Sequence, residues 1–329
     1  MQWTADTSAG DWLRDRIDDP WAATMHDMVP RGFESYTRIF HGASKSKPID
    51  DTWPALPYEQ HRDAWEAFSA RQPEIETVAA GWGDAAAAFG THMHANAQWG
   101  TIVRVPDTDP NLWGQVNAPN GWRFDAPPVG KLDTALVSVV AALAATHTTT
   151  PDDAFVGLWE GWAGLVGAVG YGPARGFYTI NDETSDSKKA HRWTSLVEAT
   201  RNGWLRKTSW QPGMLSDEIS RGPRFSLLNR DFVLFRSALA ELANPDWVLS
   251  VPWRDRESEA HGLEPSAQSP NIIWPADRSW VIVSEIDWDS TIVAGPHSLA
   301  QALRDDPRLE TFSVREGASL QWDADGVNR

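Results

Sequence analysis

The sequence predicts an α+β fold with a mixed or antiparallel sheet, packed helices and a tryptophan-rich core. Segments with helical periodicity and short segments rich in Val, Ile, Phe and Trp are interspersed along the 329 residues, without the strict β–α–β rhythm of a doubly wound sheet. Most of the 20 tryptophans stand in apolar or Pro/Gly contexts, which favours burial of their large rings. No glycine-rich phosphate loop follows a predicted strand, so we do not expect a nucleotide-binding fold.

Five segments have the periodicity or the boundary residues of helices. The clearest is Leu132–Thr146, in which apolar residues recur at intervals of three and four and so form one stripe along a helix. The residues of this stripe that we expect to be buried are Leu136, Val139, Val140 and Leu143. The other predicted helices are Trp12–Met25, Glu59–Arg71, Asp231–Ala243 (with Phe235 and Leu239 buried) and Ser298–Arg304.

Six short segments rich in β-branched and aromatic residues are predicted to be strands, because such side chains fit a pleated, half-buried surface. These segments are Thr101–Val105, Ala154–Trp159, Phe177–Ile180, Trp247–Val251, Trp280–Ile286 and Thr311–Val314.

The length permits one large domain or two modest ones, and no segment repeats at a fixed period. The polar stretch Asp182–Lys189 is typical of an exposed loop and is the best candidate for a boundary. The sequence therefore predicts a single unit of residues 1–329, which can divide into two lobes of about residues 1–181 and 190–329.

The composition excludes several classes of function. The 29 Lys and Arg against 45 Asp and Glu give a formal net charge of −16, which opposes binding to nucleic-acid phosphates and to anionic membranes. The absence of cysteine excludes thiolate nucleophiles, disulfides and cysteine-ligated metals. We expect a soluble, cytoplasmic protein, because the N-terminus does not have the pattern of a secretory signal and no uninterrupted apolar stretch is long enough to span a membrane.

An acidic cluster near the C-terminus is the first candidate site. Glu285, Asp287 and Asp289 alternate with Ile286 and Trp288, so on a strand the three carboxylates would line one face. If they are enclosed, a divalent cation such as Mg²⁺, Mn²⁺ or Ca²⁺ or an arginine must offset their repulsion. The alternative is a solvated edge strand with an arginine nearby.

Two histidines and a glutamate are the other candidates. His92 and His94 share one face if their segment is a strand, and with carboxylates from elsewhere they could bind a metal. Glu160 lies between two tryptophans, where its pKa could be raised for acid–base catalysis. Together with Glu285 it could form a carboxylate pair of the glycosidase kind. For each of these candidates a structural role is the alternative.

Several segments also resemble known families. THTTTPDDAFVGLWEGW (Thr146–Trp162) and SPNIIWPADRSWVIVSEIDWDSTIVAG (Ser269–Gly295) resemble a family of hypothetical proteins from high-GC soil bacteria. This resemblance covers most of the chain, implies one continuous unit and carries over no catalytic residue. The predicted pattern of strand, acidic turn, strand and helix in the C-terminal third resembles the end of the SUKH immunity proteins, which bind and neutralise toxins.

These observations favour a non-enzymatic cytosolic binding protein with a protein partner, of the immunity kind if the second resemblance holds, and without a cofactor. One alternative is a hydrolase that depends on a divalent metal held by the carboxylates or by the histidine pair. The other is a carbohydrate-binding protein that uses exposed tryptophans, because tryptophan rings can stack on sugars.

Overall fold

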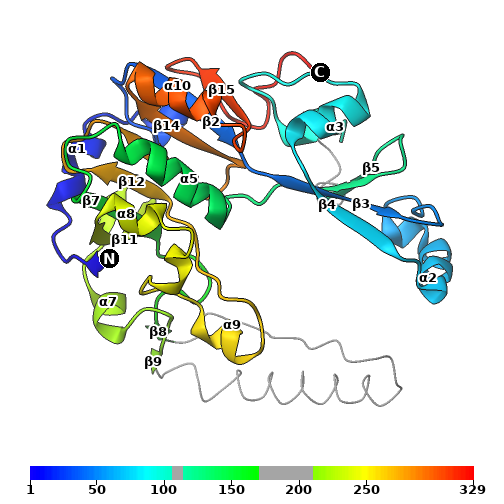
Figure 1. Cartoon of the computed structure of the whole chain (residues 1–329), viewed down its shortest axis with the longest axis horizontal. Helices are drawn as coiled ribbons and strands as arrows, with labels where there is room; N and C mark the ends of the chain where they lie inside the picture. The colour runs from blue at the N-terminus through cyan, green and yellow to red at the C-terminus, as the bar shows by residue number, and fades with distance from the viewer. Residues whose placement is uncertain (106–113, 170–209) are drawn as a thin grey trace.

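A nine-stranded sheet forms the centre of the computed structural model, which describes residues 1–105, 114–169 and 210–329. Its strands follow the order β1, β11, β7, β12, β13, β14, β2, β15, and β10 pairs with β11. A second sheet has the order β4, β3, β6, β5 and extends away from the first (Figure 1). The pairings in both sheets are antiparallel, which confirms the predicted α+β class.

The elements alternate irregularly along the chain. The strands are β1 (Gln2–Trp3), β2 (Ser35–Phe40), β3 (Ala43–Pro48), β4 (Ile75–Ala80), β5 (Gln115–Asn117), β6 (Arg123–Asp125), β7 (Ala154–Trp159), β8 (Ala168–Val169), β9 (Trp210–Gln211), β10 (Phe225–Leu227), β11 (Arg230–Ser237), β12 (Ile272–Pro275), β13 (Val281–Val283), β14 (Ser290–Gly295) and β15 (Thr311–Val314). The helices are α1 (Asp11–Arg14), α2 (Arg62–Arg71), α3 (Trp82–Phe89), α4 (Trp99–Ile102), α5 (Thr134–Ala145), α7 (Asp217–Arg221), α8 (Leu239–Ala243), α9 (Arg256–Ala260) and α10 (His297–Asp305).

Both faces of the large sheet are covered by apolar side chains. In β11, Val233 and Phe235 belong to a cluster that includes residues of α5, α8 and α10, whereas Phe232 and Leu234 belong to a cluster that includes residues of α1. This alternation is the two-residue period of a strand that is buried on both sides. The largest fully buried side chains include five tryptophans, which confirms the tryptophan-rich core: Trp82, Trp247, Trp253, Trp274 and Trp280.

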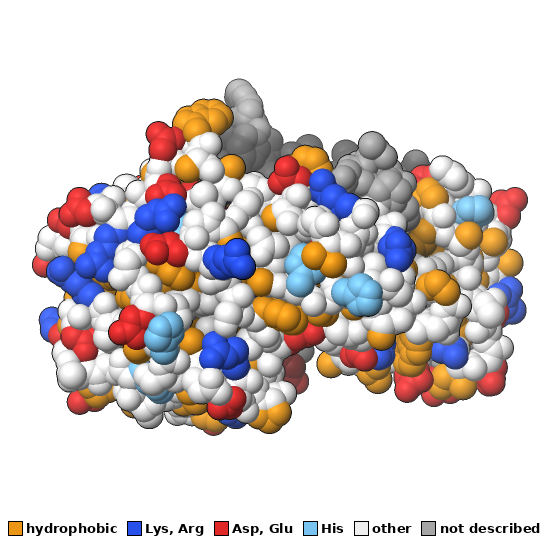
Figure 2. Space-filling model, turned by 90° about the horizontal axis from the view of Figure 1, so that it is seen from above, with side chains coloured by type: hydrophobic (Ala, Val, Ile, Leu, Met, Phe, Trp, Pro, Cys, Tyr) orange, Lys and Arg blue, Asp and Glu red, His pale blue; other side chains and the backbone are white. Residues whose placement is uncertain are grey.

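The small sheet continues from the large one through a very short link. Only His41 and Gly42 separate the end of β2 from the start of β3, and the two strands lead from one sheet into the other (Figure 1). Glu310, next to β15, accepts hydrogen bonds from the backbone N–H groups of Trp82 and Gly83 at the start of α3, both at 2.7 Å. Seen from above, the part of the molecule built on the large sheet and the part built on the small sheet have a notch between them (Figure 2).

Several predicted elements are confirmed. The strands Ala154–Trp159 and Thr311–Val314 have the predicted bounds. The predicted helices Glu59–Arg71, Leu132–Thr146 and Ser298–Arg304 correspond to α2, α5 and α10. The predicted strand Phe177–Ile180 and the predicted boundary Asp182–Lys189 lie outside the described residues.

The predicted helix Asp231–Ala243 is wrong. Its first part is strand β11, and only Leu239–Ala243 is helical. The helical spacing of Phe232, Phe235 and Leu239 was misleading because β11 is buried on both faces. A strand of this kind reads as a continuous apolar run, which periodicity alone cannot distinguish from a helix.

Four other predictions need correction. Trp12–Met25 is helical only over Asp11–Arg14, followed by turns and 3₁₀ segments around Pro20. Thr101–Val105 begins inside helix α4 instead of forming a strand, and Trp247–Leu249 is a 3₁₀ helix. Strand β13 covers only Val281–Val283 of the predicted strand Trp280–Ile286. A membrane-spanning helix is not found among the described residues.

Burial on α5 differs in part from the prediction. Val139 and Val140 are buried, as are Phe235 and Leu239, but Leu136 and Leu143 are only partly buried. The helix is apolar on most sides, so its stripe does not by itself determine which face packs most tightly.

We expect Leu239→Ala to lower the free energy of unfolding by about 2–5 kcal/mol, because the side chain is fully buried in the cluster that also holds residues of α5 and the large sheet, and its loss leaves a cavity. Leu136→Ala should cost less, because part of that side chain is already in water. Urea unfolding of both variants tests this. Equal losses would contradict the difference in burial.

Candidate functional site

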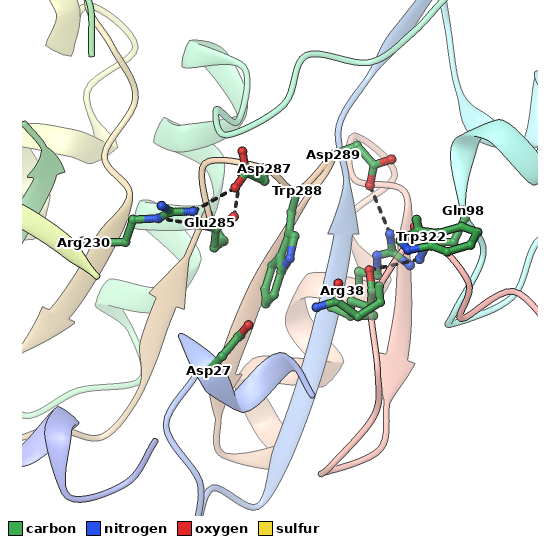
Figure 3. Close-up of a pocket in the computed structure, with 11 residues that line it drawn as sticks. Asp27, Arg38, Gln98, Arg230, Glu285, Asp287, Trp288, Asp289 and Trp322 are labelled. Carbon is green, nitrogen blue, oxygen red and sulfur yellow. Dashed lines mark hydrogen bonds and ion pairs between the residues drawn. The ribbon is translucent and has the colours of Figure 1, made fainter. Parts of the chain in front are cut away.

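A pocket of about 300 Å³ lies where the β13–β14 loop meets the C-terminal segment. Strand β2 supplies one lining residue, the start of β11 supplies another, and the segment before α4 supplies a third. Most of the lining residues are charged or polar (Figure 3): Asp27, Arg38, Gln98, Arg230, Glu285, Asp287, Trp288, Asp289, Leu320, Gln321 and Trp322.

The three predicted carboxylates line this pocket from a loop and not from a strand. The chain leaves β13 at Val283 and does not re-enter the sheet until Ser290. Gly130 binds the β13–β14 loop through its backbone: its N–H donates to the carbonyl of Trp288 at 2.8 Å. Gly130 has a φ of +74°, and a Cβ there would lie 2.6 Å from the carbonyl oxygen of Ile286. Glycine is therefore required where this backbone approaches the loop.

Arg230 joins the first two carboxylates of the loop. Its guanidinium lies 3.1 Å from Glu285 Oε1 and 2.8 Å from Asp287 Oδ2. Glu285 also accepts a hydrogen bond from the backbone N–H of Asp287 at 2.6 Å. Burial raises the pKa of Glu285, and the Asp287 N–H and Arg230 oppose that rise. Asp287 itself is largely exposed, so this pair reaches from the interior to the surface.

Arg38 binds the third carboxylate and is only 1% exposed. Its Nη2 lies 3.1 Å from Asp289 Oδ1, its Nε donates to Ser290 Oγ at 2.8 Å, and its Nη1 donates to the carbonyls of Ala95 and Ala97. Burial raises the pKa of Asp289, and the charge of Arg38 opposes the rise. The arginine thus ties the large sheet to the segment that precedes α4.

Asp27 is a pocket residue that the sequence patterns did not identify. It lies at the end of a short 3₁₀ helix, Met25–Asp27. Burial, followed by the charge of Glu285, raises the pKa of Asp27 to about 6. Its Oδ1 is buried and has no hydrogen-bond partner among the described residues. In Figure 3 this carboxylate points toward the ring of Trp288.

Two tryptophans complete the pocket. Trp288 lies between the Arg230 pair and the Arg38 pair (Figure 3), and Trp322 is 65% exposed. Gln98 donates a hydrogen bond from its side chain to the carbonyl of Leu320 at 3.4 Å. The pocket therefore presents carboxylates, guanidinium groups and aromatic rings at one place.

The two histidines lie outside the pocket. His94 Nε2 lies 2.8 Å from Asp325 Oδ1, and its Nδ1 accepts the backbone N–H of Asn96 at 3.3 Å. The backbone N–H of His92 donates to the side chain of Asn328 at 2.8 Å. These contacts fasten the C-terminal segment to the chain before α4.

Glu160 is also remote from the pocket lining. It forms an ion pair with Arg224 at 2.8 Å, and Arg224 in turn donates to backbone carbonyls at the end of α7 and just beyond it. Glu160 is therefore not among the residues that line the pocket with Glu285. The carboxylates that line the pocket with Glu285 are Asp27, Asp287 and Asp289.

The charges of the pocket are mostly compensated from within. Four carboxylates face two guanidinium groups, and three of the four are paired with them. In the part of the chain that the structure describes, no three His, Asp or Glu side chains are placed so that they could hold one metal ion. The fourth carboxylate, Asp27, leaves the pocket with excess acceptor capacity. Comparisons with family models, with curated proteins and with solved structures find no match for this chain.

Proposed function

We propose that the protein binds a basic protein partner and that the pocket accepts one ammonium or guanidinium group of that partner. The observation that carries this proposal is Asp27. No residue that the structure describes donates a hydrogen bond to its buried Oδ1, and the pocket has two more carboxylates than guanidinium groups. A buried acceptor that stays unpaired costs free energy, so a donor that also brings positive charge is the favoured occupant.

The two tryptophans support a cationic occupant. A cation over an indole ring gains about 0.5–2 kcal/mol, depending on how far it is removed from water. Trp288 lies beside Asp27, and Trp322 stands exposed on the same pocket. A guanidinium or ammonium group between them would be bound by the carboxylate and by the rings together.

The size and the charge of the molecule favour a protein partner. A pocket of about 300 Å³ has room for one side chain or one small molecule. The formal net charge of −16 steers basic macromolecules toward the protein. Trp322 is 65% exposed next to the pocket, and its ring already has the guanidinium of Arg329 over it, 5.5 Å from the ring centre.

Asp27→Asn is expected to weaken binding of a guanidinium probe by about 10- to 100-fold, because a hydrogen bond to a charged group is worth about 1.5–3 kcal/mol. The probe is Nα-acetyl-arginine amide, and the measurement is isothermal titration calorimetry. Nα-acetyl-citrulline amide has nearly the same shape without the charge and should bind weakly to the unaltered protein. Asp323→Asn, an exposed carboxylate outside the pocket lining, serves as the matched control and should leave the affinity unchanged.

Binding should also depend on pH. Asp27 must be ionised to bind the cation, so affinity should fall as the pH is lowered through about 6 and should be nearly constant well above it. Equal affinity for the arginine and citrulline probes would contradict the proposal. It would favour a neutral ligand such as a carbohydrate, for which the two tryptophans and Gln98 would also be suitable contacts.

A further inference from the structure

Strand β4 is an exposed edge whose backbone is available for pairing. It lies at one end of the four-stranded sheet, where, among the described residues, β3 is its one partner. Residues 75–79 of β4 are exposed without interruption, so side chains on both faces of the strand meet water. Among the sheet edges in the described residues, β4 is the longest such strand.

The register with β3 determines which backbone groups are free. The N–H of Ile49 donates to the carbonyl of Glu74 at 3.0 Å, and in an antiparallel pair hydrogen-bonded positions alternate. The even-numbered residues of β4 therefore face β3. The N–H and C=O groups of Ile75, Thr77 and Ala79 point outward, and no described residue outside the strand makes a backbone bond to them.

This edge lacks the features that usually prevent pairing. Exposed edges are commonly protected by lysine, proline or a bulge. Strand β4 (IETVAA) contains no lysine or proline, and Glu76 is its only charged residue. The neighbouring strand β3 carries Lys45 and Lys47, and Lys47 lies directly opposite Glu76. Lys47 thus brings a positive charge close to the one carboxylate of β4, whereas Lys45 forms an ion pair with Asp84.

The edge is complementary to itself. In an antiparallel pair centred on Thr77, the outward-facing Thr77 meets its own copy, and Ile75 meets Ala79 of the second copy. Glu76 then lies opposite Val78 and not opposite another carboxylate. A two-fold axis at Thr77 therefore satisfies the free backbone groups of both copies at once.

We propose that a second copy of this chain binds through β4, so that two four-stranded sheets join into one continuous antiparallel sheet. This inference is independent of the pocket. A six-residue strand buries little area, so the dimer is of the weak class. The net charge of each copy opposes association and is screened by salt. Dimer formation should therefore increase with ionic strength.

A single cysteine tests the register. The natural chain contains no cysteine, so Thr77→Cys provides one thiol per chain. Opposite residues in a hydrogen-bonded pair have Cα atoms about 5.5 Å apart, which is within the range of a disulfide. Under mild oxidation Thr77→Cys should form a covalent dimer. Ile49→Cys, which is 54% exposed beyond the end of β3, should form far less. Mixed Ile75→Cys and Ala79→Cys proteins should cross-link to each other faster than either does to itself.

Sedimentation of the unaltered protein gives a second, independent measurement. We expect a monomer–dimer equilibrium that can be measured between about 1 μM and several hundred μM. Thr77→Pro, which removes one outward N–H without touching the bonds to β3, should shift it to monomer. A monomer throughout that range, or cross-linking of Thr77→Cys no faster than that of Ile49→Cys, would overturn the proposal.

Discussion

Arg38→Met is expected to lower the free energy of unfolding by about 3–5 kcal/mol, the cost of breaking a buried ion pair by removing one partner. The substitution leaves Asp289 buried without its counter-charge. It also leaves the carbonyls of Ala95 and Ala97 without the donors that now bind them. Methionine fills much of the same volume, so loss of packing contributes little. Urea unfolding at pH 7 measures the change.

A second ion pair provides a matched control for this experiment. Arg236 binds Asp153 through two hydrogen bonds of 2.5 and 2.6 Å, but its side chain is 61% exposed. Arg236→Met should therefore cost less than about 1 kcal/mol. If the two substitutions cost the same, the buried guanidinium is not what holds the β13–β14 loop and the chain before α4 together.

Acidification from pH 6.5 to 4 is expected to cost about 3 kcal/mol of stability through His41 alone. Its Nδ1 donates to the carbonyl of Pro128 at 2.7 Å, and its Nε2 accepts from the hydroxyl of Thr291 at 2.9 Å. The Thr291 oxygen in turn accepts from Ser284 at 2.7 Å. Burial lowers the pKa of His41 to about 4, because a positive charge on this ring would be out of contact with water. The charge of Arg38 lowers the pKa further, and the hydrogen bond to Pro128 opposes the shift.

The direction of this effect follows from proton linkage. Between pH 6.5 and 4 the unfolded chain binds a proton at His41 and the folded chain does not, so stability falls as the pH falls. The interval of about 2.5 pH units at 1.36 kcal/mol each gives the magnitude. Asp27 acts in the opposite sense below pH 6, because its pKa is raised in the fold. The contribution of His41 is therefore isolated by comparison with His41→Gln. A variant with an unchanged slope of unfolding free energy against pH would contradict this account.

The sequence predicted the elements whose burial is one-sided or whose ends are marked. Helix α10 follows Pro296, and strand β15 is short and bounded by polar residues. Prediction failed at β11, because burial on both faces hides the two-residue period of the strand. It also failed at Trp247–Val251, which was predicted to be a strand but begins with a 3₁₀ helix whose Trp247 ring is buried in the core. In these places tertiary packing decides the local structure.

The candidate site was predictable only in part. Glu285, Asp287 and Asp289 stand out because three carboxylates are close together in the sequence. Arg38, which binds Asp289, is 251 positions away, and no local pattern links them. Asp27 stands between His26 and Met28 without another carboxylate near it in the sequence, and only the folded chain places it against Glu285 and Trp288. The sequence patterns of His92, His94 and Glu160 predicted metal ligands or a catalytic acid. In the structure their partners are Asn328, Asp325 and Arg224, which do not line the pocket.

The position of β2 in the large sheet has a consequence for the rate of folding. This strand, near the start of the chain, pairs with β14 on one side and β15 on the other, and its neighbour His41 contacts Thr291 across 250 positions. Closing loops of that length costs chain entropy before any contact repays it, and sheets dominated by such pairings fold slowly. The β3–β4 pair, in contrast, joins segments that are near one another in the chain. We therefore expect the small sheet to begin to form before β2 pairs with β14 and β15. We also expect the pairing of β2 to be the slower of the two steps.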